Sequence, residues 1–149
     1  MFVVPTCPAC GRAGAAPCAV CVGLMRVAHQ PPVPASLDDC RALLDYEGPA
    51  REVVARVKYR NHRASVAWLA AGMAALFVTA EADLVTWAPT SASRRHRRGF
   101  DQAEVLARKV AAVHGLSCRP LLTRFGGGAQ TGLGAADRRS GPGFRPTRR

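Results

Sequence analysis

The amino-acid sequence predicts an α/β fold with a parallel sheet, preceded by a small cysteine-rich module. Apolar segments of helical and strand character alternate through the middle of the 149-residue chain. Four cysteines fall in two closely spaced pairs near the amino end, ahead of a proline-rich stretch. The composition, with 48% apolar and 21% charged residues, is typical of a folded protein and excludes general disorder.

The four cysteines follow a pattern that is typical of metal ligands. Cys7 and Cys10 form one C-x2-C pair, and Cys18 and Cys21 form a second pair after seven intervening residues. Two residues between thiols allow one tight turn to direct both sulfurs at a single point, so two such turns predict a tetrahedral zinc site. The alternative is a pair of disulfides, which reducing conditions inside cells disfavour. We expect structural zinc in a module of residues 1–30. The other two cysteines are expected to be small buried apolar residues: Cys40 and Cys118.

The stretch after the cysteine pairs predicts a boundary and then the first elements of a domain. Gln30–Pro34 is expected to be a stiff, extended linker, with the α/β domain covering residues 36–124. Cys40–Tyr46 is short and mostly apolar, which predicts a strand. Gly48 and Pro49 predict the start of a helix, because proline at the first helical position loses no hydrogen bond. The apolar face of this helix is expected to comprise Val53, Val54 and Val57.

A longer apolar stretch without charged residues follows. Ala64–Ala80 spans seventeen residues, and apolar side chains recur in it at helical spacing: Leu69, Met73, Leu76 and Phe77. A membrane-spanning helix needs about 20 strongly apolar residues, whereas this stretch is shorter and rich in alanine. We therefore expect a buried helix and no membrane partner.

The clearest strand and helix signals lie on either side of a basic segment. Leu84–Pro89 predicts a buried strand closed by its proline, and Thr90–Gly99 predicts a loop. Asp101 is expected to be the N-cap of the next helix, with Glu104 completing a capping box and Gly115 ending the helix. The apolar face of this helix is expected to comprise Leu106, Val110 and Val113. One more short strand is expected at Leu121–Leu122.

The positive charge is concentrated in the second part of the chain. The net charge is +11, yet residues 1–89 carry eight cations and seven anions, whereas residues 90–149 carry thirteen cations and three anions. Such a surplus suggests an anionic partner. Residues 125–149 are rich in glycine and arginine and offer little apolar surface to offset the entropy of ordering. We therefore expect a poorly ordered, basic C-terminal tail.

The basic loop between the strand and the helix is a candidate anion site, with four arginines: Arg94, Arg95, Arg97 and Arg98. In α/β sheets, ligands lie beyond the carboxyl ends of the strands, and a helix N-terminus offers free N–H groups. Both features meet at this loop, which suggests phosphate binding. A solvated basic turn or a non-specific nucleic-acid surface remains an open alternative, because runs of charge are usually solvated. No residue is assigned a catalytic role.

Several motifs occur in an order that resembles a known family. After the paired cysteines come Tyr46-x-Gly48-Pro49, Val57-Lys58-Tyr59, the block Arg98-Gly99-Phe100-Asp101-Gln102-Ala103, and Gln130-Thr131-Gly132-Leu133. Along nearly the whole chain this order resembles the ComF-like competence-protein family, in which a zinc knuckle is joined to a type I phosphoribosyltransferase-like domain. The family usually has asparagine where this chain has Asp101.

The resemblance implies a fold, a ligand class and a cellular role. It implies a sheet with flanking helices that binds phosphoribosyl pyrophosphate or another phosphorylated sugar or nucleotide-type anion. It also implies a cytoplasmic protein of DNA uptake, with DNA or a DNA-uptake protein as a partner. Family members continue into a strand that ends in two acidic residues and a Thr/Gly-rich loop, for which this chain has no counterpart. We therefore expect an incomplete, C-terminally truncated sheet and no catalysis.

Two other interpretations stay open. In the first, the chain is a zinc-stabilised, arginine-rich nucleic-acid-binding module. Aromatic side chains that would stack on bases are not interleaved with the basic run beyond Phe100, which disfavours this interpretation. In the second, the chain is a truncated remnant without activity of its own.

Overall fold

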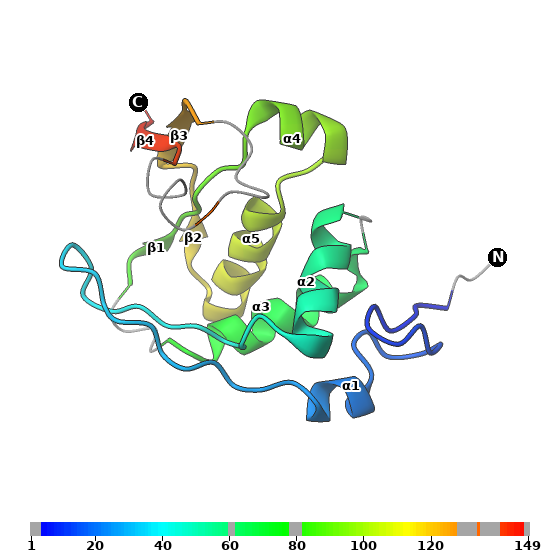
Figure 1. The fold of residues 1–149 in the computed structure, drawn as a ribbon. Helices are drawn as coiled ribbons and strands as arrows, with labels where there is room; N and C mark the ends of the chain where they lie inside the picture. Colours follow the sequence, from blue (N-terminus) through cyan, green and yellow to red (C-terminus); the bar gives the residue numbers. More distant parts are fainter. Residues whose placement is uncertain (1–3, 60–61, 78–81, 128–133, 135–140, 148–149) are drawn as a thin grey trace. The chain divides into compact units, whose positions relative to one another are not determined.

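The computed structural model (Figure 1) describes the following residues: 4–59, 62–77, 82–127, 134 and 141–147. It is a mixed α/β protein with short helices, a small parallel sheet and an antiparallel hairpin. The chain divides into two compact units, Met1–Glu81 and Ala82–Arg149. The first unit holds the cysteine pairs, and the second holds both sheets. No helix in the described ranges combines the length and the apolar character needed to cross a bilayer.

The described part of the first unit is built from α-helices and a 3-10 turn. The helix predicted from Gly48-Pro49 is confirmed as α2 (Gly48–Tyr59), and Val53 and Val57 are buried as expected. The shorter α1 (Ala19–Gly23) begins directly after Cys18, contains Cys21 and contacts α2. The proline at the start and the apolar spacing were therefore sufficient to locate the main helix of this unit.

The helix predicted over Ala64–Ala80 is shorter in the structure. A 3-10 turn (Arg63–Ser65) leads into α3 (Val66–Ala74). The chain then leaves the α-helix through i→i+3 hydrogen bonds, such as that from Phe77 N to Ala74 O (3.1 Å). Phe77 is 52% exposed, so its predicted burial is wrong. The last predicted residues, 78–80, lie outside the described residues.

Small side chains determine which face of α3 is buried. Its buried residues are Val66, Leu69, Ala70 and Ala74, of which only Leu69 was predicted. A Cβ atom at Gly72 would lie 2.8 Å from Cδ2 of Leu43, so a larger residue there would require the Leu43 side chain to move. Close packing of this kind depends on contacts distant in sequence, which explains why helical spacing alone did not predict the face.

The strand predicted at Cys40–Tyr46 does not form in the described residues. An isolated antiparallel bridge joins Val27 and Leu44 instead. Next to this bridge, a side chain rather than a second strand bonds to the backbone: Gln30 Oε1 accepts from Ala42 N (3.1 Å). Polar side chains that bond to the backbone in this way compete with regular pairing. The two cysteines outside the pairs are half-buried, less than predicted: Cys40 and Cys118.

The parallel sheet of the second unit has two strands. β1 (Leu84–Val85) pairs in parallel with β2 (Ser117–Cys118), and α5 (Gln102–His114) connects them and contacts both (Figure 1). The α/β class is thus confirmed, with a sheet smaller than predicted. The strand predicted over Leu84–Pro89 is confirmed only for its first two residues, and these are half-buried.

A proline limits the length of this sheet. Pro120 follows β2 by two residues and has no N–H to donate to a ladder. Beyond the paired residues, Arg119 N donates to Val85 O (3.0 Å), and Leu121 N donates to the side-chain Oγ1 of Thr86 (3.2 Å). The backbone pairing of β1 with β2 is therefore followed by one backbone-to-side-chain hydrogen bond, and the sheet ends there.

The strand predicted at Leu121–Leu122 begins at Leu122 and belongs to a different sheet. β3 (Leu122–Phe125) pairs antiparallel with β4 (Gly143–Pro146). The prediction of a poorly ordered tail is wrong for β4, because these residues pair with β3. The Phe125 ring lies against Gly143 and leaves no room for a Cβ atom there. The rest of the predicted tail at 128–133, 135–140 and 148–149 lies outside the described residues.

The predicted loop Thr90–Gly99 is wrong, because most of it forms α4 (Ala92–Arg98). Ser91 is its N-cap and accepts from Arg94 N (3.4 Å), and Gly99 ends it with a left-handed φ of 74°. Alanine and arginine are good helix formers, and cations in the last turn interact favourably with the helix dipole. Local capping therefore outweighs the repulsion among the arginines.

The helix predicted from Asp101 is confirmed as α5. Asp101 accepts from Ala103 N (3.0 Å) as its N-cap, and Gly115 ends the helix in a left-handed conformation (φ 67°). The predicted capping box is wrong, since Glu104 instead bonds to Arg108 one turn ahead (3.0 Å). The buried residues of α5 are Ala107, Val110 and Ala111, whereas the predicted face residue Val113 is exposed.

Candidate metal centre and arginine-lined pocket

The first cysteine pair lies in a tight turn at the tip of a short hairpin. Thr6 and Ala13 form an antiparallel bridge at the base of this hairpin. At its tip, Cys7 N donates to Arg12 O (2.7 Å), and Gly11 N donates to Cys7 O (2.8 Å). Gly11 adopts a φ of 78°, which favours glycine. The turn directs both thiols of the pair to one side.

The second cysteine pair is held by a helix. Cys18 is the residue before α1, and Cys21 lies three residues later within it. Residues three apart lie on the same face of a helix, so both thiols point the same way. Val22 N donates to Cys18 O (3.0 Å), which fixes the first turn.

The two pairs bring four sulfur atoms together. All four Sγ atoms lie within 4.8 Å of one another, and those of Cys10 and Cys18 are 3.7 Å apart. Tetrahedral metal–thiolate bonds of about 2.3 Å require sulfurs about 3.8 Å apart. All six cysteines are free thiols, so the pairs do not form the alternative disulfides. Three of the four ligand candidates are buried and Cys10 is exposed. This cluster can hold a metal ion.

The environments of the four thiols differ. Burial acts to raise the pKa of Cys7, but backbone N–H groups of Cys18, Cys10 and Ala9 donate to its sulfur and lower this pKa to about 6. Burial raises the pKa of Cys21 to about 12, with further contributions from the neighbouring sulfurs. The Cys7 thiolate is therefore available to bind a cation, whereas the Cys21 thiol keeps its proton until a tightly bound metal ion displaces it.

The four arginines predicted as an anion site lie on α4. Arg95 pairs with Glu104 (3.6 Å), and Arg98 donates to Gln102 Oε1 (2.7 Å). Arg94 is half-buried and Arg97 is exposed. Arg94, Arg97 and Arg98 are spaced three and four residues apart and therefore share one face of α4, on which Arg97 is exposed.

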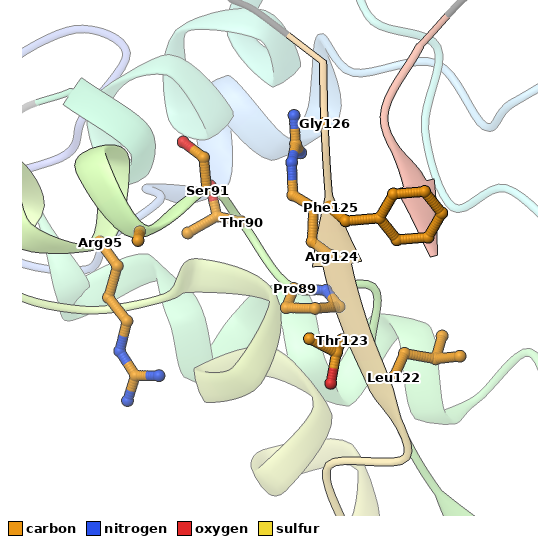
Figure 2. Close-up of a pocket in the computed structure, with 10 residues that line it drawn as sticks. Pro89, Thr90, Ser91, Arg95, Leu122, Thr123, Arg124, Phe125 and Gly126 are labelled. Carbon is orange, nitrogen blue, oxygen red and sulfur yellow. The ribbon is translucent and has the colours of Figure 1, made fainter. Parts of the chain in front are cut away.

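A pocket of about 410 Å³ lies beside α4 in the second unit (Figure 2). The segment that leads into α4 lines one side, and β3 lines the other. Its lining contains two cations, no acids and three hydroxyl side chains: Arg95, Arg124, Thr90, Ser91 and Thr123. Of the four predicted arginines, only Arg95 lines it.

The structure adds Arg124 on β3, which the sequence interpretation assigned to no site. The half-buried and exposed positions alternate along Leu122–Phe125. The sequence Leu-Thr-Arg-Phe does not itself alternate between apolar and polar residues, so no local signal indicated which side of this strand is buried. Only the structure places Arg124 and Leu122 on its more buried side.

Known proteins give no guide to either site. No protein-family model, no curated protein and no solved structure matches this chain. What the cysteine cluster and the pocket bind therefore follows from their own residues.

Proposed function

We propose that this chain is a ComF-like protein of phosphoribosyltransferase type that is stabilised by zinc and binds a phosphorylated sugar or nucleotide-type anion without catalysis. The pocket beside α4 supports this ligand class, because its lining has two arginines and three hydroxyl groups and no acid. The pocket lies next to the segment that follows β1, and α/β proteins bind ligands beyond the carboxyl ends of their strands. Its volume of about 410 Å³ suits a small ligand.

Zinc is the metal that fits the cysteine cluster. Four thiolates are a soft ligand set, and tetrahedral sulfur ligation is typical of zinc. With four protein ligands and no open position, the ion would have a structural role. Cys7, Cys10, Cys18 and Cys21 would hold it, and binding would supply folding free energy that the short segment cannot obtain from an apolar core.

Zinc affinity is expected to fall as pH is lowered, and more steeply below about pH 6. Above that pH, Cys7 is already a thiolate and has no proton to lose, whereas Cys21 must release one at any ordinary pH. Below it, zinc must displace the Cys7 proton as well, so the slope of log K against pH increases by about one. Competition with a chromophoric chelator from pH 5 to 8 measures this slope. A constant slope across the range would contradict the assignment of Cys7, and Cys40→Ser, outside the cluster, serves as the control.

A zinc-stabilised nucleic-acid-binding module is the second candidate function. Among the described residues, no acidic side chain pairs with Arg94 or Arg97, and Arg97 is exposed on α4. An arginine of this kind is available for phosphate groups of a polyanion. DNA binding of this type weakens linearly with the logarithm of salt concentration.

Two substitutions on α4 are expected to separate the candidates. Arg95→Ala should weaken saturable binding of ribose 5-phosphate about tenfold, because one charge-assisted contact to the pocket is lost. Arg97→Ala should leave this affinity within twofold and lower only the salt-dependent affinity for duplex DNA. Titration calorimetry with ribose 5-phosphate and salt-series binding to a duplex measure both. Salt-dependent DNA binding without any saturable binding of the sugar phosphate would favour the second candidate.

A further inference from the structure

Arg124 has a guanidinium group in which two donor atoms have no hydrogen-bond partner among the described residues. Its Nε and Nη2 atoms are both buried, and neither has a hydrogen-bond partner in the described part of the chain. A buried donor without a partner costs about 1–3 kcal/mol, and more when the group is charged. Native structures rarely retain such a group unless water, a ligand or an ion completes it.

The two unsatisfied atoms lie on one edge of the guanidinium. Nε–H and the adjacent Nη2–H point in parallel and form the fork that binds two oxygens of one oxyanion side-on. In Figure 2, Arg124 stands on β3, facing the side of the pocket that Thr90 and Ser91 line. Arg124 therefore belongs to the pocket lining, but its fork is closed to solvent, so an anion reaches it only when the side chain turns into the pocket.

The hairpin holds Arg124 in position. Within the β3–β4 ladder, Arg124 is paired with Phe144, and its neighbour Phe125 is paired with Gly143. Thr123 Oγ1 also lies 3.4 Å from Thr147 Oγ1 across the hairpin. A binding residue on a paired strand is positioned more precisely than one on a loop, which favours a defined ligand over diffuse counter-ions.

We propose that Arg124 is the anion-binding residue of this pocket and takes a phosphate monoester side-on through Nε and Nη2. This inference rests on the proposed function and goes beyond it by assigning the residue and the mode of binding. A phosphate offers oxygens beyond the two that the fork engages, and Arg95 and the pocket hydroxyls are available for them. A carboxylate has only two oxygens and would leave these groups without a partner.

Arg95 can turn toward the ligand at little cost to the protein. It pairs with Glu104 at 3.6 Å, but Glu104 is bound more closely by Arg108 at 3.0 Å. When Arg95 leaves, Glu104 therefore keeps a counter-ion. Arg124 supplies the bidentate contact, and Arg95 supplies a second charge.

Calorimetry on the full zinc-loaded chain tests this inference with inorganic phosphate, ribose 5-phosphate and acetate as probes. The wild type is expected to bind both phosphate probes and not acetate. Arg124→Gln should weaken ribose 5-phosphate about 10- to 100-fold, as the loss of a charge-assisted bidentate contact implies. Arg124→Lys, which keeps the charge but lacks the fork, should lose most of the same affinity. Arg119→Gln removes an equal charge outside the pocket lining and should change affinity less than twofold.

Thermal unfolding without ligand provides a second readout that does not depend on binding. Because the buried guanidinium atoms are unsatisfied, Arg124→Met is expected to melt at the same temperature as the wild type or higher, and to lose the rise in melting temperature that ribose 5-phosphate causes in the wild type. A large fall in the melting temperature of unliganded Arg124→Met would show that Arg124 is a structural residue and overturn the inference.

The outcomes separate this inference from the proposed function. If the wild type binds no phosphate probe, the proposed function fails and the inference fails with it. If the wild type binds ribose 5-phosphate and Arg124→Gln binds it equally well, the pocket function stands and the assignment of Arg124 is wrong. Equal binding of acetate and phosphate would overturn the preference for phosphate.

Discussion

Cys18→Ser is expected to abolish stoichiometric zinc binding and to unfold the cysteine module. Cys18 is buried, and its sulfur lies 3.7 Å from that of Cys10. Structural zinc sites contribute apparent binding free energies of about 10–16 kcal/mol, which here would replace the missing apolar core. The buried cluster of this module consists of Cys7, Cys18 and Cys21, with Ala9 packed against it, so little else stabilises it.

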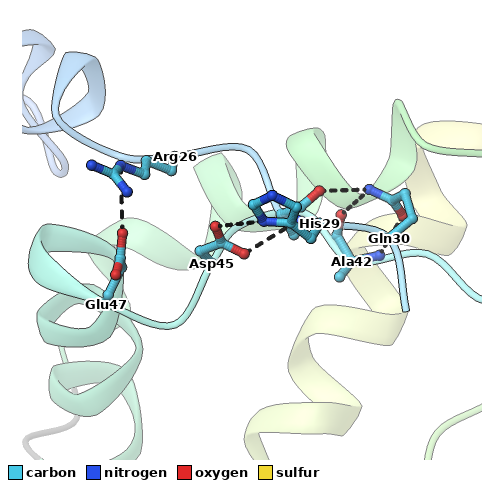
Figure 3. Close-up of polar contacts among 7 residues, drawn as sticks. Arg26, His29, Gln30, Ala42, Asp45 and Glu47 are labelled. Carbon is cyan, nitrogen blue, oxygen red and sulfur yellow. Dashed lines mark hydrogen bonds and ion pairs between the residues drawn. The ribbon is translucent and has the colours of Figure 1, made fainter. Parts of the chain in front are cut away.

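The loss of order is expected to extend toward α2. Polar contacts join the last residues of the module to the chain before α2 (Figure 3): Arg26 pairs with Glu47 at 3.6 Å, and His29 N donates to Asp45 Oδ1 at 3.2 Å. The ion pair is exposed and contributes little to stability, so it cannot keep the start of α2 ordered once the module unfolds.

Amide hydrogen exchange and zinc analysis of the same samples measure both effects of Cys18→Ser. Protection should fall in residues 4–28 and partly at the start of α2, and the zinc content should fall to background. Cys40→Ser is the matched control, because Cys40 lies outside the cluster and should retain one zinc and full protection. Unchanged protection in Cys18→Ser would mean that the module folds without its metal.

Asp101→Ala is expected to destabilise the second unit by about 2–4 kcal/mol, since a helix cap and a buried acceptor are lost together. The Asp101 side chain is buried and accepts from two backbone donors, Ala103 N (3.0 Å) and Thr90 N (2.7 Å). It therefore caps α5 and also fixes the segment that leads into α4. Removal leaves both donors without their partner.

Asp101→Asn provides a graded control for this prediction. The amide retains one acceptor oxygen and presents an NH2 group to the second donor, so about half of the loss is expected, about 1–2 kcal/mol. Chemical denaturation followed by circular dichroism measures both variants. An Asp101→Ala variant within about 0.5 kcal/mol of the wild type, as for ordinary surface substitutions, would contradict the role of Asp101 as a double acceptor.

Elements with local signals could be predicted from the sequence. Pro49 at a helix start, Asp101 and Gly115 as caps, and the two C-x2-C turns each act over a few residues, so α2, α5 and the cysteine cluster followed from the sequence. The basic segment carried equally local capping signals in Ser91 and Gly99. Its charge concealed them, because a run of arginines suggested a solvated loop.

Features that depend on distant partners could not be predicted in the same way. β4 forms because β3 is available to pair with it, and nothing within its own glycine- and proline-containing sequence indicates a strand. The parallel sheet is short because Pro120 interrupts one strand while Thr86 serves as an acceptor on the other. Arg124 became a candidate binding residue only when the hairpin placed it beside the segment before α4.

X-ray absorption spectroscopy at the zinc edge, on protein purified under reducing conditions, tests the proposal that Cys7, Cys10, Cys18 and Cys21 hold one zinc ion. The expected result is one zinc per chain with four sulfur neighbours at about 2.3 Å and no nitrogen or oxygen neighbour. Zinc-free protein, or a zinc ion with fewer than four sulfur neighbours, would contradict it.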